Sequence, residues 1–213
     1  MLAVKLSRQA KAPVRMMLSR KEDHLATGNR PDSIQTVSIG AKSDGKITAI
    51  KLISFGTPGV GGGAGTSGPA KNIYDVEKIY TEESDVYTNA GPAAPFRAPG
   101  HPQGAFALEQ TIDEMAYRLG MDPLEFRRMN SISDKVRQEE YRIGADKFGW
   151  SQREPKAGAG KGVIKTGWGL ANSVWYYIYN ADSHVSLRVN DDGSVHLRSG
   201  VQDIGGGNGT PLA

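Results

Sequence analysis

A short loop, PFRAPGHPQG (residues 95–104), contains the residue types that most suggest chemistry. Arg97 provides a rigid fork of N–H donors and a permanent positive charge. Gly100 allows the backbone to approach a ligand closely, and the helix expected after the loop adds backbone N–H groups and the positive end of its dipole. These groups suit an anionic or oxo-bearing ligand. The same residues are also compatible with a plain turn at the start of a helix, with Arg97 in solvent.

A second loop, VQDIGGGNGT (residues 201–210), has three successive glycines bounded by Gln202, Asp203 and Asn208. A row of accessible backbone N–H groups of this kind suits a phosphate or a pterin-type heterocycle. The alternative is an irregular exit from a hairpin. Residue chemistry alone does not separate the two interpretations.

A third stretch, GVGGGAGTSGPAK (residues 59–71), contains the pattern G-x-G-x-x-G at Gly63, Gly65 and Gly68. A dinucleotide fingerprint needs a strand before the glycines and an amphipathic helix directly after them. The run ITAIKLISF supplies a strand, but Pro69 follows the last glycine and the next residues lack the apolar spacing of a helix. We therefore predict a flexible surface loop rather than a nucleotide site.

Other polar and aromatic residues give weaker signals. The four histidines lack the paired spacing of metal ligands, although His101 lies in the Arg97 loop and is a candidate for a substrate-side group. Asp113 and Glu114 lie on the long helix expected after that loop and are interpreted as solvated or structural. The aromatic residues of WYYIY (residues 175–179) are interpreted as packing within a strand.

Composition excludes several classes of function. The chain has 213 residues, of which 38% are hydrophobic and 23% charged, as in an ordinary globular protein. Its net charge of +3 is scattered without a basic stripe, which argues against nucleic acid as a partner. The lack of cysteine excludes thiolate catalysis, cysteine-bound zinc and iron–sulfur ligation by this chain. No apolar run approaches the roughly 20 residues of a membrane span, and the first residues lack the apolar core of a signal peptide.

The elements that position these loops follow from periodicity and turn signals. We predict helices over residues 2–10, 103–120, 123–130 and 134–148, and extended segments over residues 14–18, 76–89 and 168–179. Hairpins are predicted around Asp44-Gly45 and Asp192-Gly193. Residues 151–162 are expected to link a first domain (residues 1–150) to the start of a second (residues 163–213). Both ends look cut, so we expect a segment of a longer polypeptide.

The segment FRAPGHPQGAFALEQTIDEMAYRLGMDPLEFRRMN (residues 96–130) closely resembles the molybdenum-cofactor-binding large subunit of the xanthine dehydrogenase and aldehyde oxidase family. The shared pattern is an arginine loop, a Glu-x-x-Ile-Asp helix, Leu-Gly-x-Asp-Pro and Arg-x-x-Asn. The loop at residues 201–210 is similar to the family's Gln-Asp-x-Gly-x-Gly loop, and the resemblance spans nearly the whole chain. It implies an α+β fold with mixed sheets and packed helices, made of portions of the two molybdopterin-binding domains of a molybdenum hydroxylase.

The resemblance also implies roles for residues in the two loops. Arg97 would sit beside the molybdenum and the substrate as the catalytic residue, while Phe96, Ala98 and Gly100 would line the cofactor. A second set would contact the pterin or its phosphate: Gln202, Gly205, Gly206 and Gly207. The pterin holds the molybdenum in this family, so no metal ligand is expected from the chain itself.

Family members hydroxylate aldehydes or N-heterocycles with oxygen from water, and electrons pass to partner subunits that hold iron–sulfur clusters and FAD. The implied cofactor is molybdenum–molybdopterin in its cytosine dinucleotide form. The implied partners are the remainder of the large subunit, the iron–sulfur and FAD subunits and a small aldehyde or heterocycle, with neither nucleic acid nor a membrane span. A cytoplasmic location is expected, with export in a folded state alongside a partner as the alternative.

The chain departs from the family pattern in ways that limit these expectations. The family's Gly-Gly-Gly-Phe-Gly-Gly loop would precede Met1, and its general-base glutamate would follow Ala213, so no residue here takes that role. His101 stands where many members have Gly or Glu, which leaves the substrate open. We therefore expect the isolated segment to be inactive. The alternatives are a nicotinamide-dependent oxidoreductase, based on the Gly63 pattern, and a non-enzymatic binding module.

Overall fold

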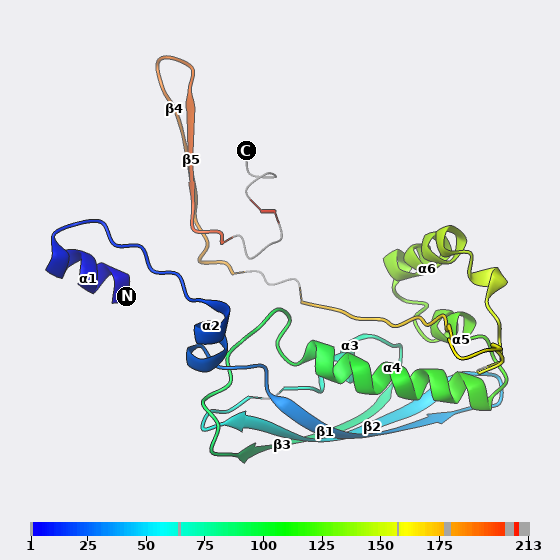
Figure 1. The fold of residues 1–213 in the computed structure, drawn as a ribbon. Helices are drawn as coiled ribbons and strands as arrows, with labels where there is room; N and C mark the ends of the chain where they lie inside the picture. The colour runs from blue at the N-terminus through cyan, green and yellow to red at the C-terminus, as the bar shows by residue number, and fades with distance from the viewer. Residues whose placement is uncertain (1, 64, 157, 177–179, 203–206, 209–213) are drawn as a thin grey trace. The chain divides into compact units, whose positions relative to one another are not determined.

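The computed structural model describes residues 2–63, 65–156, 158–176, 180–202 and 207–208 (Figure 1). The chain forms two compact units, Met1–Trp175 and Tyr176–Ala213, and each is described by itself. The first contains a three-stranded sheet with helices packed on it, and the second contains a two-stranded hairpin. This is the α+β fold that the sequence predicts.

The sheet of the first unit is built on the predicted hairpin. Strand β1 (Asp32–Ala41) pairs antiparallel with β2 (Ile47–Gly59), and Gly45 has φ 92° in the turn between them. The Asp44 carboxylate accepts a hydrogen bond from the N–H of Lys46 at 3.0 Å, which stabilises that turn. Strand β3 (Lys78–Tyr87) pairs parallel with β2 and confirms the extended segment predicted there. Strand β2 is therefore the central strand, with the order β1-β2-β3.

The connection between β2 and β3 corrects the prediction for residues 59–71. It contains a short helix, α3 (Gly68–Asn72), and residues 66–70 are buried rather than exposed on a flexible loop. Pro69 fits at the start of this helix because that position needs no N–H donor. Burial follows from close packing, since a Cβ at Gly104 would lie only 2.0 Å from the carbonyl oxygen of Thr66. The five residues of α3 do not form the amphipathic helix of a dinucleotide fingerprint.

Three helices after residue 100 match the predictions closely. Helix α4 (His101–Arg118) is followed by Gly120 at φ 67°, the conformation of a C-terminal glycine. Helix α5 (Pro123–Met129) is capped by the carboxylate of Asp122, which accepts from the N–H groups of Leu124 and Glu125. Helix α6 (Lys135–Phe148) is capped by Asp134 and ends at Gly149, before the short 3-10 helix η1 (Trp150–Gln152).

The first residues of the chain agree only in part with the prediction. Helix α1 (Leu2–Ala10) has the predicted limits. Residues 14–18 form no strand, and the alternation of apolar side chains there is not matched by any pairing segment. Instead, helix α2 (Arg20–Ala26) follows, with a capping box in which Ser19 and Glu22 bind each other's backbone N–H groups.

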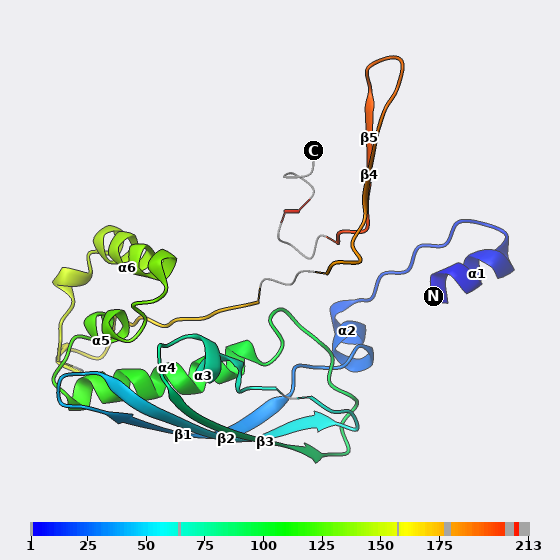
Figure 2. The same cartoon turned by 180° about the vertical axis from the view of Figure 1, so that it is seen from behind.

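The core of the first unit lies between the sheet and α4. Figures 1 and 2, two opposite views of the molecule, both show α4 lying along one face of the sheet. The core side chains are almost fully buried apolar residues of β2 and α4, supplemented from α3 and α5. They include Ile50, Leu52, Leu108, Ile112 and Phe126. This packing fixes the N-terminus of α4, and hence the Arg97 loop, relative to the sheet.

The second unit contains strands β4 (Val185–Val189) and β5 (Val195–Ser199), which pair antiparallel and confirm the second hairpin. Gly193 has φ 80° in its turn. The strand predicted over residues 168–179 is wrong for residues 168–176, which have no regular structure, and residues 177–179 lie outside the described part. The proposed linker at residues 151–162 and the domain limits stay predictions. Among the described helices, none is both long enough and apolar enough to span a membrane.

Candidate functional site

The Arg97 loop turns the chain sharply into α4. Ala98 has φ 53°, a left-handed conformation that costs a residue with a Cβ roughly 1 kcal/mol. Gly100 follows with φ 78° as the N-cap and is buried. The N–H of His101 donates to the carbonyl oxygen of Ala98 at 3.0 Å, which closes the turn. Phe96 and Arg97 are both exposed at the outer side of the loop.

Arg30 holds the backbone of this loop. Its Nη2 donates to the carbonyl oxygens of Phe96 at 3.0 Å and Arg97 at 2.7 Å. Its Nη1 donates to Oε1 of Gln103 at 3.3 Å, and its guanidinium carbon lies 5.1 Å from the centre of the Phe96 ring. Arg30 is remote in sequence, and no local pattern marks it, so sequence reasoning missed this residue. The loop is consequently a fixed element with two exposed side chains.

A small cavity of about 90 Å³ opens beside the Arg97 loop. One part of its wall comes from the loop and the segment before it, and another part comes from the glycine-rich connection after β2. The lining residues are Arg30, Pro31, Gly62, Gly63, Ala93, Ala94, Pro95, Phe96, Pro99 and Gly100. Arg97 belongs to the loop but does not line the cavity. At this volume the cavity suits a small group or the end of a larger ligand.

His101 lies inside the first unit. Its side chain is 3% exposed, and its ring meets the edge of the Trp175 ring with centroids 4.9 Å apart. Its Nδ1 lies 3.3 Å from the carbonyl oxygen of Pro99. These contacts place His101 beneath the Arg97 loop, and its suggested position on the substrate side stays a prediction.

A buried ionic cluster supports the helix that carries the loop. Arg127 is fully buried, and its Nε donates to Glu109 Oε2 at 2.9 Å while its Nη1 donates to Asp113 Oδ1 at 2.5 Å. Glu109 also accepts from the hydroxyl of Tyr74 at 2.6 Å and from the N–H of Asn172 at 2.8 Å. Burial and the neighbouring Glu109 charge raise the pKa of Tyr74 far above its ordinary value, although Arg127 opposes this shift. The cluster joins Tyr74, just after α3, to α4, α5 and residue 172.

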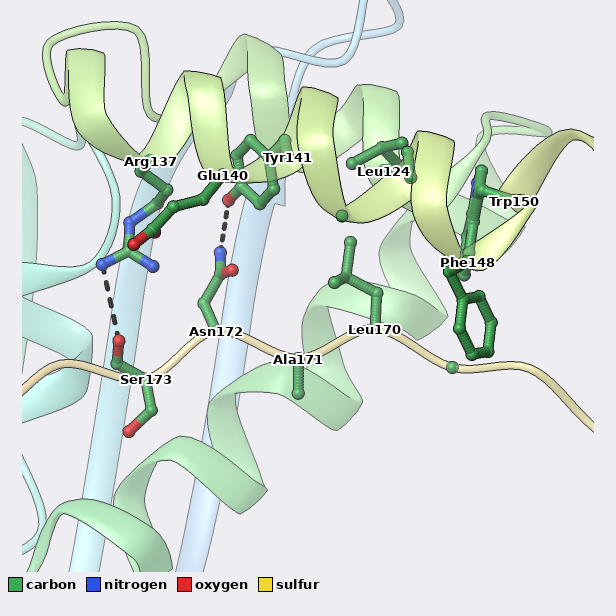
Figure 3. A pocket seen from close by; sticks show the side chains of 13 residues that line it. Leu124, Arg137, Glu140, Tyr141, Phe148, Trp150, Leu170, Ala171, Asn172 and Ser173 are labelled. Carbon is green, nitrogen blue, oxygen red and sulfur yellow. Dashed lines mark hydrogen bonds between the residues drawn. The ribbon is translucent and has the colours of Figure 1, made fainter.

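A larger cavity of about 470 Å³ lies between α6 and the extended segment at residues 169–173 (Figure 3). Figure 3 shows the side chain of Asn172 pointing to Tyr141, where its Nδ2 donates to the hydroxyl at 2.5 Å. It also shows Arg137 bound to the carbonyl oxygen of Ser173, at 3.4 Å. The aromatic residues Phe148 and Trp150 line its other end. The lining contains none of the residues that the sequence predicts for the site.

The second predicted loop belongs to the second unit. Gly207 has φ 76°, and the Nδ2 of Asn208 donates to the carbonyl oxygen of Gln202 at 3.3 Å. Gly205 and Gly206 lie outside the described residues. The structure therefore brings together Phe96, Arg97, Ala98, Gly100 and His101, whereas the approach of Gln202 and Gly207 to them stays a prediction.

Comparison with known proteins decides the family. The sequence pattern of the molybdopterin cofactor-binding domain matches residues 1–131. The chain belongs to this family. The matched part includes β1, β2, β3, α4 and α5, and hence the Arg97 loop and most of the buried cluster.

Individual relatives support this assignment. The chain is 33% identical to the aldehyde oxidoreductase molybdenum-binding subunit PaoC of Escherichia coli (strain K12), over all of this chain and 31% of that protein. It is 30% identical to xanthine dehydrogenase of Drosophila subobscura over 94% of this chain and 17% of that protein. The chain thus spans less than a third of the length of these curated relatives, and its resemblance to the molybdenum-binding subunits is confirmed.

The fold is shared with a solved aldehyde oxidoreductase. The aldehyde oxidoreductase from Desulfovibrio desulfuricans ATCC 27774 matches with a TM-score of 0.69 and 24% identity, covering 90% of this chain and 23% of that chain. At this identity the likeness shows the fold.

The residues around the Arg97 loop fit an anionic cofactor of the kind that the family name describes. The backbone is fixed by Arg30, glycines line the cavity from both segments (Gly62 and Gly63 from one, Gly100 from the other), and an exposed guanidinium extends from the same loop. Among the described residues, no group of His, Cys, Asp or Glu could hold a metal ion. A metal held by a pterin would need no such group from this molybdopterin cofactor-binding domain.

Two parts of the family pattern prove to be structural. Arg127 of the Arg-x-x-Asn motif binds Glu109, as described above. Asn130 is 2% exposed, and its Oδ1 accepts from the N–H of Ile47 at 2.8 Å while its Nδ2 donates to the carbonyl oxygens of Gly45 and Phe126. The motif therefore holds α5 against the β1–β2 turn. No local pattern reveals this contact, because Gly45 and Ile47 are more than 80 residues away from Asn130.

Proposed function

We propose that this chain is a segment of the catalytic subunit of a molybdenum hydroxylase that oxidises aldehydes or N-heterocycles with oxygen from water. The observation that carries the proposal is the fixed Arg97 loop within a molybdopterin cofactor-binding domain. The relatives named as aldehyde oxidoreductase and xanthine dehydrogenase subunits support both substrate classes.

Molybdenum–molybdopterin would supply the redox chemistry and the activated oxygen when bound. The chain's own part is to bind and orient. The backbone of residues 96–100, held by Arg30, would contact the cofactor, and Arg97 would place its positive charge beside the substrate. A fixed charge near developing negative charge stabilises a transition state without reorganisation. Gln202 and the glycines at 205–207 would bind the pterin or its phosphate through backbone groups.

The finer features of the proposal concern the assembly. The cofactor would be the cytosine dinucleotide form, and partner subunits with iron–sulfur clusters and FAD would accept the electrons. Because the chain spans 31% of the length of PaoC, we expect no turnover from the chain by itself. The natural assembly would act in the cytoplasm, or in the periplasm after export with a partner.

The experiment that tests the proposal is substitution of Arg97 in the natively expressed protein that contains this chain. We expect Arg97→Ala to lower kcat/KM for the preferred aldehyde or heterocycle by about 10²- to 10³-fold, with molybdenum content unchanged. The kcat/KM of Arg97→Lys should lie between those of the wild type and Arg97→Ala, because an ammonium keeps the charge but loses the planar fork. The exposed Arg128→Ala serves as the matched control. Normal kinetics in Arg97→Ala would show that the loop has no such role, and a molybdenum-free wild-type protein would favour a plain binding module.

A further inference from the structure

The glycine-rich connection after β2 lies beside the Arg97 loop in the fold, although the sequence suggests a variable surface loop. Gly62 and Gly63 line the same cavity as Phe96 and Gly100. The two segments are also joined at their bases, since the N–H of Ala93 donates to the carbonyl oxygen of Pro58 at 2.9 Å. The connection therefore forms one wall of the proposed site.

Two carboxylates of β3 hold this wall. Asp85 Oδ2 accepts from the N–H of Gly63 at 2.7 Å. Glu83 Oε1 accepts from the N–H groups of Thr66 at 2.5 Å and Ser67 at 2.9 Å, and its Oε2 accepts from the Ser67 hydroxyl at 2.7 Å. Glu83 and Asp85 are two residues apart on one strand, so their side chains leave the same face. Charge-assisted bonds of this type are about twice as strong as neutral ones.

The far end of the connection is fixed as well. The Thr66 hydroxyl binds that of Ser54 on β2 at 2.8 Å, and the Thr66 carbonyl packs directly on Gly104 in the first turns of α4. Gly63 and Gly65 have φ 94° and 53°, backbone conformations that residues with a Cβ rarely adopt. The path of the described residues 59–63 and 65–67 is thus set from β3, β2 and α4 together.

We propose that Glu83 and Asp85 are positioning residues that hold Gly63, Thr66 and Ser67 and thereby the second wall of the site, and that Gly62 and Gly63 set the size of the group that enters beside the Arg97 loop. This inference rests on the proposed molybdenum hydroxylase function for its kinetic consequence. Its structural part, the anchoring of the wall by β3, does not depend on the cofactor.

Hydrogen exchange tests the anchoring in the natively expressed protein. We expect Glu83→Ala and Asp85→Ala to speed amide exchange in a peptide covering residues 60–70 by at least about tenfold, because the N–H groups lose their acceptors. Glu83→Gln, which keeps one acceptor oxygen, should restore part of the protection. The matched control is Glu82→Gln, whose carboxylate binds Tyr80 on the other face of β3. Unchanged exchange in both alanine variants would overturn the inference.

Steady-state kinetics test whether Gly62 and Gly63 form a wall of the working site. We expect Glu83→Ala and Asp85→Ala to raise KM about tenfold with a smaller change in kcat, since placement of the substrate is affected more than the reacting group. Gly62→Leu gives a second kind of variant, because a Cβ there would meet only Asp85 Oδ2 within 4 Å beyond its chain neighbours, at an ordinary contact distance of 3.9 Å. Because its side chain would narrow the cavity, Gly62→Leu should lower kcat/KM for the bulky benzaldehyde about tenfold more than for the small acetaldehyde. Gly160→Leu, in the segment remote from the cavity, is its control.

The outcomes separate this inference from the function on which it rests. Faster exchange with unchanged KM and unchanged size preference would show that residues 62–67 are anchored but form no wall of the working site, which overturns the inference and leaves the function intact. Wild-type protein without molybdenum and without turnover would instead overturn the function. Faster exchange together with the kinetic changes supports both.

Discussion

Arg127 is a fully buried guanidinium whose charge is balanced by Glu109 and Asp113. A buried ion pair adds little by itself, because desolvation offsets the attraction, but removal of one partner leaves the other charge buried and unbalanced. Glu109 is only 4% exposed and also binds Tyr74 and Asn172. Glu109 is thus part of a structural junction between α4, α5 and residues 74 and 172.

Substitution of Arg127 should show this role. We expect Arg127→Met to lower the free energy of unfolding by about 3–5 kcal/mol, because Glu109 loses its counter-charge. Arg128→Met, next to it but exposed, should change the free energy by less than about 1 kcal/mol. Urea unfolding followed by circular dichroism measures both. Similar small losses in the two variants would mean that the cluster is not what joins α4 to α5.

Tyr74 makes the stability of the first unit sensitive to alkaline pH. Burial, and then the Glu109 charge, raise the pKa of its hydroxyl above the ordinary value of 10.0. A folded-state pKa above the unfolded one gives stability that is fully present below pH 10 and is lost as the pH rises further. We therefore expect the free energy of unfolding to fall above pH 10 in the wild-type protein and to fall less steeply in Tyr74→Phe.

The control for this prediction is Tyr87→Phe, at a position that is 75% exposed. Its pH dependence should match that of the wild type. Unfolding curves at a series of alkaline pH values provide the measurement. Identical slopes for wild type and Tyr74→Phe would contradict the burial of an un-ionised hydroxyl against Glu109.

At the scale of single residues, sequence reasoning located the Arg97 loop but not what holds it. Loop residues carry their own signals, such as glycine, proline and arginine close together. Arg30, Glu83 and Asp85 act through partners far along the chain, and nothing in their own neighbourhood distinguishes them from solvated charges. The ionic cluster was missed for the same reason.

At the scale of elements, the helices after residue 100 and both hairpins were predictable because each has local start and stop signals. Asp122-Pro123, Asp134 and Gly149 mark helix ends by their own chemistry, and Asp44-Gly45 marks a turn. The strand expected over residues 14–18 was wrong because a short, mostly apolar run does not by itself supply a partner strand. The burial of residues 66–70 depends on contact with α4, which no local pattern reveals.

Asp122 is the cap whose loss should matter beyond its own helix. Its carboxylate accepts from the N–H of Leu124 at 2.8 Å and also from the indole N–H of Trp150 at 3.1 Å. We expect Asp122→Ala to lower the free energy of unfolding by about 1–3 kcal/mol, because one cap and a link to η1 are lost together. Trp150 fluorescence should shift in the folded state as its hydrogen-bond partner disappears.

Asp134→Ala is the comparison for this cap, since the Asp134 carboxylate accepts from Arg137 on its own helix and, in the part of the chain that the structure describes, binds no element after α6. Asp134→Ala should lower the free energy of unfolding by less than Asp122→Ala does, and it should leave the Trp150 emission unchanged. Chemical denaturation monitored by fluorescence gives both quantities. An equal cost for the two substitutions would argue against the link between α5 and η1.

At the scale of the whole molecule, the family assignment rests on residues 1–131, whereas the second loop belongs to residues 176–213. The predicted convergence of the Arg97 loop and the glycines at 205–207 on one pterin concerns both units. It could be stated from the sequence only through resemblance, because two loops that are about 100 residues apart share no local pattern. The sheet, α4 and the buried cluster explain how the first loop is held ready for that role.

Anomalous X-ray scattering at the molybdenum absorption edge, from crystals of the natively expressed protein, measures this convergence directly. We expect one molybdenum peak beside Arg97, with residues 202–207 against the pterin that holds the metal. A peak remote from Arg97, or density that places the two loops on opposite sides of the protein, would contradict the assignment of the site.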